Sequence, residues 1–251
     1  MIPVIVRNIK IGEGIPKICV PILGRTREEI LQEGRNLLTY GADVAEWRVD
    51  FYQDSVCKER TVETAGLLRE VLGNVPLLFT FRSKREGGEK DISGEFYREL
   101  NLAAAFSGFV DLVDVEAFFH DVPVKKLTEE LHQAGVKVIG SNHDFAQTPK
   151  REEIVKRLND MRALGVDIPK IAVMPNSPED VLTLLAATLE VSESGMDCPI
   201  ITMSMGKEGM VSRVSGGTFG SALTFGAVEK CSAPGQIEAR ELRKMMQILQ
   251  G

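Results

Sequence analysis

Charged side chains stand inside short apolar segments that are expected to be buried strands. Glu46 and Arg48 lie in DVAEWRVD, Arg82 in PLLFTFRS, His143 in VKVIGSNHDF and Lys170 in DIPKIAVMP. A buried charge is unfavourable unless it is paired or used in chemistry. The segments therefore predict one polar site assembled inside a single core.

Lys170 and His143 indicate the chemistry of that site. A buried lysine among arginines is expected to have a lowered pKa, and a neutral amine can attack a carbonyl carbon. An imidazole titrates near neutrality, so His143 could remove and return a proton. Glu86, in the loop SKREGGEK, could orient His143 or could be an ordinary solvated acid. These residues predict an enzyme with a lysine nucleophile.

Three arginines indicate an anionic substrate. Arg48, Arg82 and Arg213 are expected to converge on one end of the core, where planar forks of donors suit a carboxylate. Asp114 and Glu116, in VDLVDVEAF, could serve catalysis. They could equally form a structural ion network with Arg48, and the sequence leaves both interpretations open.

Composition narrows the class of protein. The chain has 251 residues, 43% apolar composition and a formal net charge of −6. We expect one domain, residues 1–251, with no basic face for nucleic acid or an anionic membrane. No apolar run is long enough to span a membrane and no signal-peptide pattern is present, which predicts a cytoplasmic protein. The cysteines lack metal-ligand spacing and are predicted to be reduced, buried thiols: Cys19, Cys57, Cys198 and Cys231.

Eight apolar runs of strand length alternate with segments of helical periodicity. The runs are 17–23, 43–49, 75–81, 110–116, 136–142, 168–174, 199–205 and 218–225. Their spacing of about 22 to 34 residues is the length of one parallel βαβ unit. The pattern predicts an α/β fold, a (β/α)8 TIM barrel. An open doubly wound sheet is the alternative, but no GxGxxG turn follows the first run.

Start signals and turns place further elements. Helix starts are predicted at three threonines: Thr26, Thr61 and Thr148. The last helix is predicted over 236–249. Residues 1–14 hold two β-prone pieces around Arg7-Asn8, which predict an N-terminal β-hairpin closing the bottom of the barrel.

Side-chain parity decides which residues face the barrel axis. Successive residues of a strand point to opposite faces, so one parity points inward and the other lies under the helices. Glu46 and Arg48 share one face of their strand, and Trp47 lies on the other. The same argument places Arg82, Asp114, His143 and Lys170 inside. Five strands therefore direct polar side chains toward one axis.

Six segments together resemble a known family. They are EWRVD (46–50), FTFRS (79–83), SNHDF (141–145), PKIAVMP (169–175), ITMSM (201–205) and SAPGQ (232–236). In this order, from about residue 17 to the C-terminus, they resemble type I 3-dehydroquinate dehydratase, the Schiff-base enzyme of the shikimate pathway of aromatic amino acid biosynthesis. The resemblance implies a (β/α)8 barrel, usually a homodimer, that binds the small molecule 3-dehydroquinate and uses no metal or organic cofactor.

The resemblance also implies a role for each site residue. Lys170 matches the imine-forming lysine, His143 the general acid/base, and Glu86 the acid that pairs with that histidine. Further positions match substrate-binding residues: Glu46, Arg48, Arg82, Arg213, Ser232 and Gln236, with Met203, Met205 and Phe225 as apolar residues lining the pocket. Pro21 stands where some members have a serine, so one possible hydroxyl contact with substrate is lost.

The implied reaction is a dehydration that yields 3-dehydroshikimate. Lys170 would form an imine with the ring ketone, and His143 would move the protons. The loop 230–236 could close over the ligand or be a plain connection. A class I aldolase, which would cleave a carbon–carbon bond, and a non-catalytic relative are the alternatives. Analysis of the products formed from dehydroquinate distinguishes a dehydratase from an aldolase. Any turnover at all excludes a non-catalytic relative.

Overall fold

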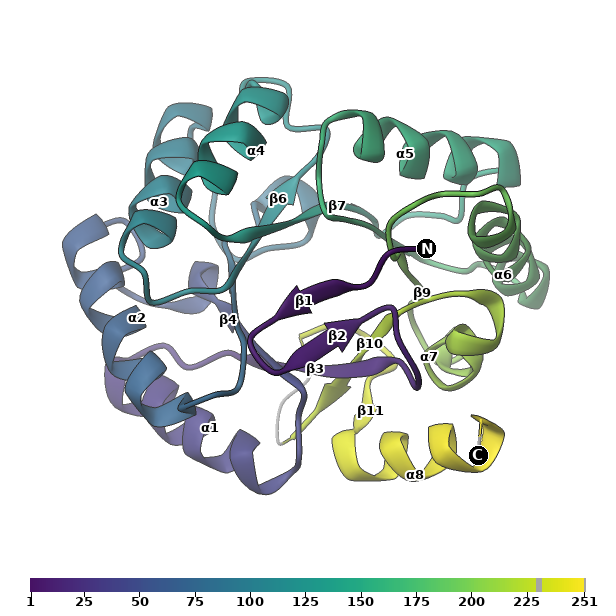
Figure 1. The fold of residues 1–251 in the computed structure, drawn as a ribbon, viewed down its shortest axis with the longest axis horizontal. Coiled ribbons are helices and arrows are strands. Elements are labelled where there is room, and N and C mark those ends of the chain that lie inside the picture. The colour runs from purple at the N-terminus through teal and green to yellow at the C-terminus, as the bar shows by residue number, and fades with distance from the viewer. Residues whose placement is uncertain (229–231, 251) are drawn as a thin grey trace.

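The main sheet of the protein curls into a barrel that is surrounded by helices (Figure 1). The computed structural model describes residues 1–228 and 232–250. The barrel strands run in chain order and pair in parallel: β3 (Lys17–Ile22), β4 (Val44–Arg48), β5 (Leu77–Thr80), β6 (Leu112–Glu116), β7 (Lys137–Asp144), β8 (Ile168–Val173), β9 (Ile201–Ser204) and β10 (Leu223–Ala227). The predicted α/β barrel is confirmed.

The barrel closes between β9 and β10. Ile200 and Ser221 form a parallel bridge, and the N–H of Ala222 donates to the carbonyl of Ile200 at 2.8 Å. The hydroxyl oxygen of Ser221 accepts from the N–H of Thr202 at 3.0 Å. A side chain thus takes the place of a backbone acceptor at this seam, and within the described residues β11 (Ile237–Glu238) extends the sheet to nine strands.

Helices cover the outer face of the barrel. They are α1 (Arg27–Thr39), α2 (Lys58–Leu72), α3 (Gly94–Phe106), α4 (Val124–Gln133), α5 (Arg151–Ala163), α6 (Pro178–Glu193), α7 (Met210–Ser215) and α8 (Ala239–Gln250). Thr26 caps α1 as predicted, since its hydroxyl accepts from the N–H of Glu29 at 3.2 Å. Of the helices built from described residues, none is both long and apolar enough to cross a membrane.

The other two predicted helix starts are wrong. Helix α2 begins after Cys57, so Thr61 already lies inside it and donates its N–H to the Cys57 carbonyl at 3.0 Å. Helix α5 begins after Lys150. The hydroxyl of Thr148 instead donates to the carbonyl of Met174 at 3.0 Å, which ties it to the loop after β8.

The last strand and helix begin later than predicted. The predicted strand 218–225 begins only at Leu223, because the glycine-rich residues before it form a short 3-10 helix, Gly216–Phe219. The predicted helix 236–249 begins at Ala239, because the two residues before it pair with β10.

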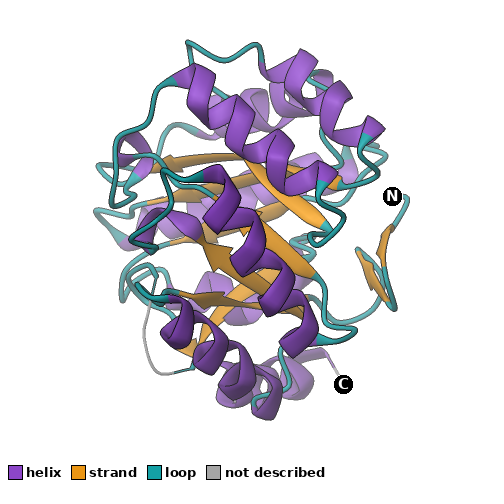
Figure 2. Cartoon of the chain, turned by 90° about the vertical axis from the view of Figure 1, so that its left-hand side faces the viewer, coloured by secondary structure: helices purple, strands orange, loops and turns teal. Residues whose placement is uncertain are grey.

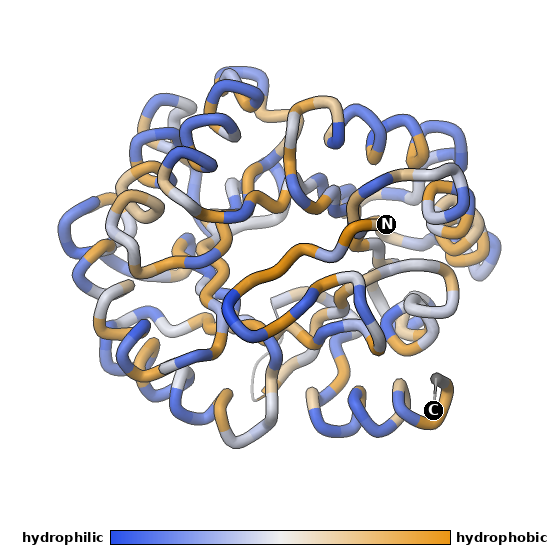
Figure 3. Tube along the Cα trace, in the orientation of Figure 1, coloured by the Kyte–Doolittle hydropathy of each residue, from blue (hydrophilic) through white to orange (hydrophobic). Residues whose placement is uncertain are grey.

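The predicted N-terminal hairpin lies across one end of the barrel (Figure 2). Strands β1 (Val4–Val6) and β2 (Ile9–Ile11) pair antiparallel around a turn at Arg7 and Asn8. Figure 3 shows apolar β1 and a hydrophilic turn. The hairpin packs on the first inward layer of the barrel: Cys19, Val44, Leu78, Leu112, Ile139, Ile168, Ile201 and Leu223. Apolar burial therefore closes the bottom, and the polar layers lie above it.

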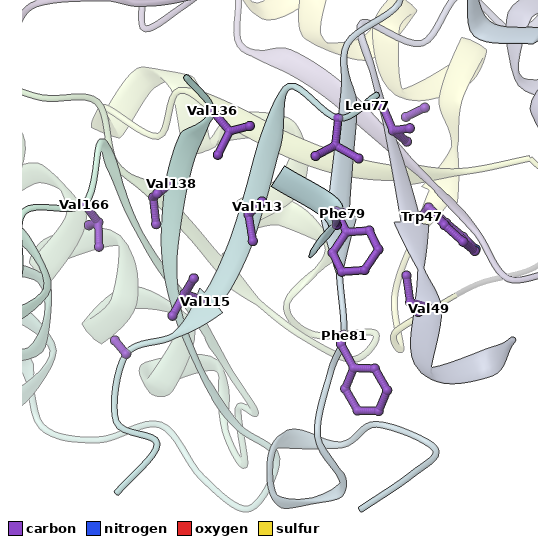
Figure 4. Packing of buried hydrophobic residues seen from close by; sticks show 14 of the residues in the cluster. Trp47, Val49, Leu77, Phe79, Phe81, Val113, Val115, Val136, Val138 and Val166 are labelled. Atoms are coloured by element: carbon purple, nitrogen blue, oxygen red, sulfur yellow. The ribbon is translucent and has the colours of Figure 1, made fainter. Parts of the chain in front are cut away.

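The opposite parity of the strands forms a second core under the helices. Trp47, Phe79, Phe81, Val113 and Val138 belong to this outer cluster, and Figure 4 shows them beside one another on neighbouring strands. Trp47 and Phe79 meet edge to face, with 5.8 Å between ring centroids. The predicted alternation is thus observed, and the charged side chains of the same strands point into the barrel.

Three aspartates each link two neighbouring strands at the bottom of the barrel. Each stands one residue before a strand and accepts at 2.8 Å from a backbone N–H of the strand before it: Asp43 from Ile18, Asp111 from Leu77 and Asp167 from Val138. A carboxylate in each of these places satisfies an N–H and holds the register of two strands. Asp111 also pairs with Arg7 of the hairpin at 2.6 Å and with Arg69 at 2.8 Å.

The cysteines fit the prediction in part. Cys19 and Cys198 are buried free thiols, whereas Cys57 is only half-buried at the start of α2. Burial raises the pKa of the Cys198 thiol to about 11. Cys231 lies outside the described residues.

Candidate active site

A pocket of about 450 Å³ opens at the carboxyl ends of the barrel strands. Its lining includes all twelve site residues predicted from the sequence: Glu46, Arg48, Arg82, Glu86, His143, Lys170, Met203, Met205, Arg213, Phe225, Ser232 and Gln236. They come from six of the strands, β4, β5, β7, β8, β9 and β10, and from the segments that follow these strands. The structure brings these residues together, and their individual roles stay predictions.

Lys170 is buried at the middle of β8, with 3% of its surface exposed. Its Nζ donates to Oδ2 of Asp114 at 3.1 Å and lies 4.5 Å from the ring centroid of Phe225. Burial by itself raises the pKa of Asp114, but the positive charges of Arg82 and Lys170 outweigh it and lower that pKa to about 2. The neutral amine expected from the neighbouring arginines stays a prediction, because this carboxylate also contacts the Lys170 nitrogen.

Arg82 is the hub of the buried ion network. Its Nη2 donates to Asp114 at 2.7 Å, and its Nη1 donates to Glu116 at 3.2 Å and to Ser141 at 2.9 Å. The network predicted for Asp114 and Glu116 therefore forms around Arg82 and not around Arg48. The reason is strand order, because Arg82 follows β5, which is next to β6, whereas Arg48 lies one strand further away.

Arg48 has a different carboxylate partner. Its Nε and Nη2 each donate to Asp50 at 2.8 Å, in a bidentate pair that is almost fully buried. Asp50 also accepts the backbone N–H of Glu89 at 3.1 Å, which ties the loop after β5 to the end of β4. The pair fixes the guanidinium plane of Arg48 at the pocket wall.

Glu86 and His143 form a hydrogen-bonded pair. Oε2 of Glu86 lies 2.9 Å from Nδ1 of His143 and accepts the backbone N–H of His143 at 3.1 Å. Glu86 is 9% exposed, so the solvated-acid interpretation is wrong. The loop positions it through a 3-10 turn, Lys84–Glu86, beside the end of β7.

Burial governs the protonation of this pair. It raises the pKa of Glu86 to about 8, although Arg82 opposes the change. It also lowers the pKa of His143, and the positive charges of Arg82 and Lys170 act in the same direction. Groups this close take up protons as a unit. Because Nδ1 faces Glu86, Nε2 is the nitrogen left for a substrate.

The far side of the pocket is built from α7 and the segment after β10. Nη2 of Arg213 donates to the carbonyl of Pro234 at 3.1 Å. Gln236 and Ser232 bind one another, since Nε2 of Gln236 donates to the Ser232 hydroxyl at 2.9 Å. Residues 230 and 231 of the predicted loop 230–236 lie outside the described residues, and its closure stays a prediction.

The pocket is also lined by four residues that were not predicted from the sequence: Gly87, Phe145, Ala172 and Ala233. Phe145 stacks on His143, with 6.4 Å between ring centroids. Parity could have found it, because it stands two residues after His143. Gly87 has a φ of +82°, and a Cβ there would lie 2.3 Å from the Phe145 ring. Residues 1–228 and 232–250 contain no cluster of three or more His, Cys, Asp or Glu that could hold a metal ion.

The fold and the pocket define a class: α/β-barrel enzymes with a buried lysine and a histidine–carboxylate pair at the carboxyl ends of the strands. A sequence model of the type I 3-dehydroquinase family matches residues 18–251. The 3-dehydroquinate dehydratase of Listeria welshimeri is 56% identical over 247 residues, which cover 98% of this chain and 97% of that protein. The 3-dehydroquinate dehydratase of Klebsiella pneumoniae is 52% identical over 98% of both chains.

Solved structures agree with these matches. The crystal structure of type I 3-dehydroquinate dehydratase from Clostridium difficile, with covalently modified comenic acid, has a TM-score of 0.96 and 50% identity. The match covers 100% of this chain and 99% of that one. The chain belongs to the type I 3-dehydroquinase family, and it is a lyase. The predicted family and enzyme class are confirmed.

Proposed function

We propose that this enzyme dehydrates 3-dehydroquinate to 3-dehydroshikimate through an imine at Lys170, as a step of the shikimate pathway. One observation carries the proposal. The amine of Lys170 and the Glu86–His143 pair line the same pocket, together with three arginines. A nucleophile, a proton-transfer group and a carboxylate-binding surface are the groups that this reaction needs.

The reaction begins with addition of the Lys170 amine to the ring ketone, and loss of water gives a protonated imine. His143, through Nε2, then takes a proton from the adjacent carbon, and the electron pair moves into the imine to form an enamine. The enamine expels the β-hydroxyl, which leaves as water with the proton that His143 returns. A water molecule hydrolyses the product imine and frees Lys170. The net change is the loss of one water from the substrate.

The surrounding groups hold the reactants in place. Asp114 lies 3.1 Å from the Lys170 nitrogen, where it is a counter-ion for the protonated imine. Arg213, Ser232 and Gln236 are the proposed contacts for the substrate carboxylate and hydroxyls. The pocket wall also carries the apolar side chains of Met203, Met205 and Phe225, which keep water from the intermediate.

Reductive trapping tests the proposed mechanism. Borohydride reduces an imine to a stable amine, so wild-type protein mixed with 3-dehydroquinate should gain the mass of the reduced substrate on Lys170. Lys170→Ala should gain none, and His143→Ala should trap an imine while releasing little product. Identification of 3-dehydroshikimate as the released product excludes carbon–carbon cleavage. Absence of an adduct from folded, substrate-treated wild-type protein would contradict the mechanism.

Three further expectations remain proposals: a single domain over residues 1–251, a cytoplasmic location and a homodimer. Exposed apolar side chains on neighbouring elements support the homodimer, with Leu182 on α6 at 66%, Val211 on α7 at 52% and Ile248 on α8 at 83% exposed. Sedimentation of wild-type protein and of Ile248→Lys tests it. A monomeric wild type would contradict the proposal.

A further inference from the structure

The second oxygen of the Glu86 carboxylate has a partner outside the proposed catalytic pair. Nδ2 of Asn142 donates to Oε1 of Glu86 at 3.0 Å, while Oε2 faces His143. Asn142 stands on β7 between two inward-facing residues, Ser141 and His143, so its own parity is outward. The half-buried amide therefore reaches the carboxylate from the side of the barrel that α5 covers.

Arg157 of α5 holds the other end of that amide. Its Nη1 donates to Oδ1 of Asn142 at 3.1 Å, and its Nε donates to Glu153 at 2.8 Å, one turn earlier in the helix. A guanidinium has donors and no acceptor. The oxygen of Asn142 must therefore face Arg157, and its NH₂ group must face Glu86.

This polarity decides which oxygen of Glu86 faces the imidazole. Asn142 holds Oε1 on the side away from the imidazole, which leaves Oε2 at 2.9 Å from Nδ1 of His143, and a proton shared by the pair lies in that contact. We propose that Asn142, oriented by Arg157, is a positioning residue that fixes the Glu86 carboxylate against His143 and directs the shared proton to the Oε2–Nδ1 contact. The proposal deepens the proposed function and rests on it for its catalytic consequence.

The other groups around Glu86 act differently. Arg82, at the end of β5, lies 3.4 Å from Oε2, the same oxygen that faces His143. Glu116 and Asp114 on β6 are negatively charged and disfavour a second carboxylate nearby. His143 faces Glu86 from β7. Asn142 favours the carboxylate form at Oε1, so its loss should raise the pH at which the pair takes up its proton.

Replacement of Asn142 by alanine tests this inference. A hydrogen bond to a charged group is lost, so we expect Asn142→Ala to shift the proton uptake of the pair upward by about one pH unit. At pH 7 this lowers kcat/KM by about tenfold, with the change mostly in kcat. Asn142→Asp should shift it further, because it places a second carboxylate beside Glu86. The pH of proton uptake should therefore increase from wild type to Asn142→Ala to Asn142→Asp. A purely structural role of Asn142 would not produce this order.

Two variants on α5 complete the comparison. Arg157→Gln should give a smaller shift in the same direction, because the amide loses its orientation but not its contact. Lys156→Gln is the matched control, since it breaks an ion pair with Asp160 on the same helix and should leave the pH profile unchanged. Arg157 is 27% exposed, so this variant provides the test if Asn142→Ala does not fold.

Histidine NMR separates this proposal from the proposed function. The chain has three histidines, and ¹⁵N imidazole signals report the titration of His143 without any turnover. If the wild type does not dehydrate 3-dehydroquinate, the proposed function fails, while the titrations of wild type and Asn142→Ala still test the Asn142 contact. Identical titrations in folded wild type, Asn142→Ala and Asn142→Asp would overturn the proposal.

Discussion

The amine of Lys170 and the carboxylate of Asp114 lie 3.1 Å apart inside the barrel, and Asp114 has no exposed surface. They come from β8 and β6, so the contact passes over β7, whose Ser141 hydroxyl donates to Asp114 at 2.5 Å. Arg82 donates to the other side of the same carboxylate. The position of the nucleophile is thus set by an anion on β6 that Ser141 of β7 and Arg82, which follows β5, hold in place.

Asp114→Asn should destabilise the protein and impair imine formation. Removal of the carboxylate takes one acceptor from Arg82 and the hydrogen-bond partner from the Lys170 amine inside a buried ion network, which costs about 3 to 5 kcal/mol. We expect lower urea midpoints and a smaller yield of borohydride-trapped adduct per folded molecule. Unchanged stability and trapping would show that Asp114 has neither role.

Asp114 should also make the free energy of unfolding depend on pH in the acid range. Its pKa is lowered to about 2 in the folded protein, so its contribution is present above the unfolded value near 3.8 and is lost as the pH falls toward 2. A shift of this size corresponds to roughly 2 kcal/mol. Urea unfolding at pH 5 and pH 2.5 should show this loss in the wild type. Asp114→Asn should show a correspondingly smaller loss over the same range.

The Glu86–His143 pair should make activity rise with pH. An extra proton on the pair leaves hydrogen on Nε2, where the proposed base needs a lone pair, and the pKa of Glu86 is raised to about 8. kcat/KM should therefore rise as the pH passes through about 8. Glu86→Gln should lose this limb of the profile. A wild-type profile that is flat between pH 6 and pH 9 would contradict the assignment.

The same shift has the opposite effect on stability. A carboxyl group whose pKa is raised on folding binds more protons in the folded state. Its contribution is present below the unfolded pKa near 4.5 and is lost as the pH rises through about 8. Between these values Glu86→Gln should lose less stability with rising pH than the wild type does, which thermal unfolding at several pH values can measure.

Gly235→Ala should raise KM. Gly235 has a φ of +76°, and an added Cβ would lie 2.1 Å from the carbonyl oxygen of Gly206, so the segment carrying Ser232 and Gln236 must move. The matched control is Gly108→Ala, which has a φ of +74° and no atom within 4 Å of the new Cβ. Equal effects of the two substitutions on KM would show that backbone strain alone is responsible.

Asp111→Ala should reduce stability and leave the chemistry intact. It removes the acceptor for the Leu77 N–H and two ion pairs, with Arg7 and Arg69. Loss of a buried charged acceptor costs about 1 to 3 kcal/mol or more. Asp121→Ala is the control, because its ion pair is exposed and should change stability by less than about 0.5 kcal/mol. Activity per folded molecule should match the wild type, since Asp111 lies at the far end of the barrel.

Much of the barrel could be predicted because alternation along a strand is a local property. Trp47 and Phe79 lie outward, and Glu46, Lys170 and His143 line the pocket, as parity requires. Boundaries were harder where tertiary contacts override local signals. Thr148 has the residue type of a helix cap, but its hydroxyl donates to a carbonyl of another loop. The residues before α8 have helical periodicity, but an adjacent strand edge pairs with them.

The amino-acid sequence by itself determined the α/β-barrel class, the inward polar residues and the family, because these depend on periodicity and on residue types in order along the chain. The tertiary structure decided which charges pair. Arg82 rather than Arg48 holds Asp114, and Asn142 reaches Glu86 from the helix side of the barrel wall. Pairing depends on distances between atoms that lie tens of residues apart in sequence, and folding sets those distances.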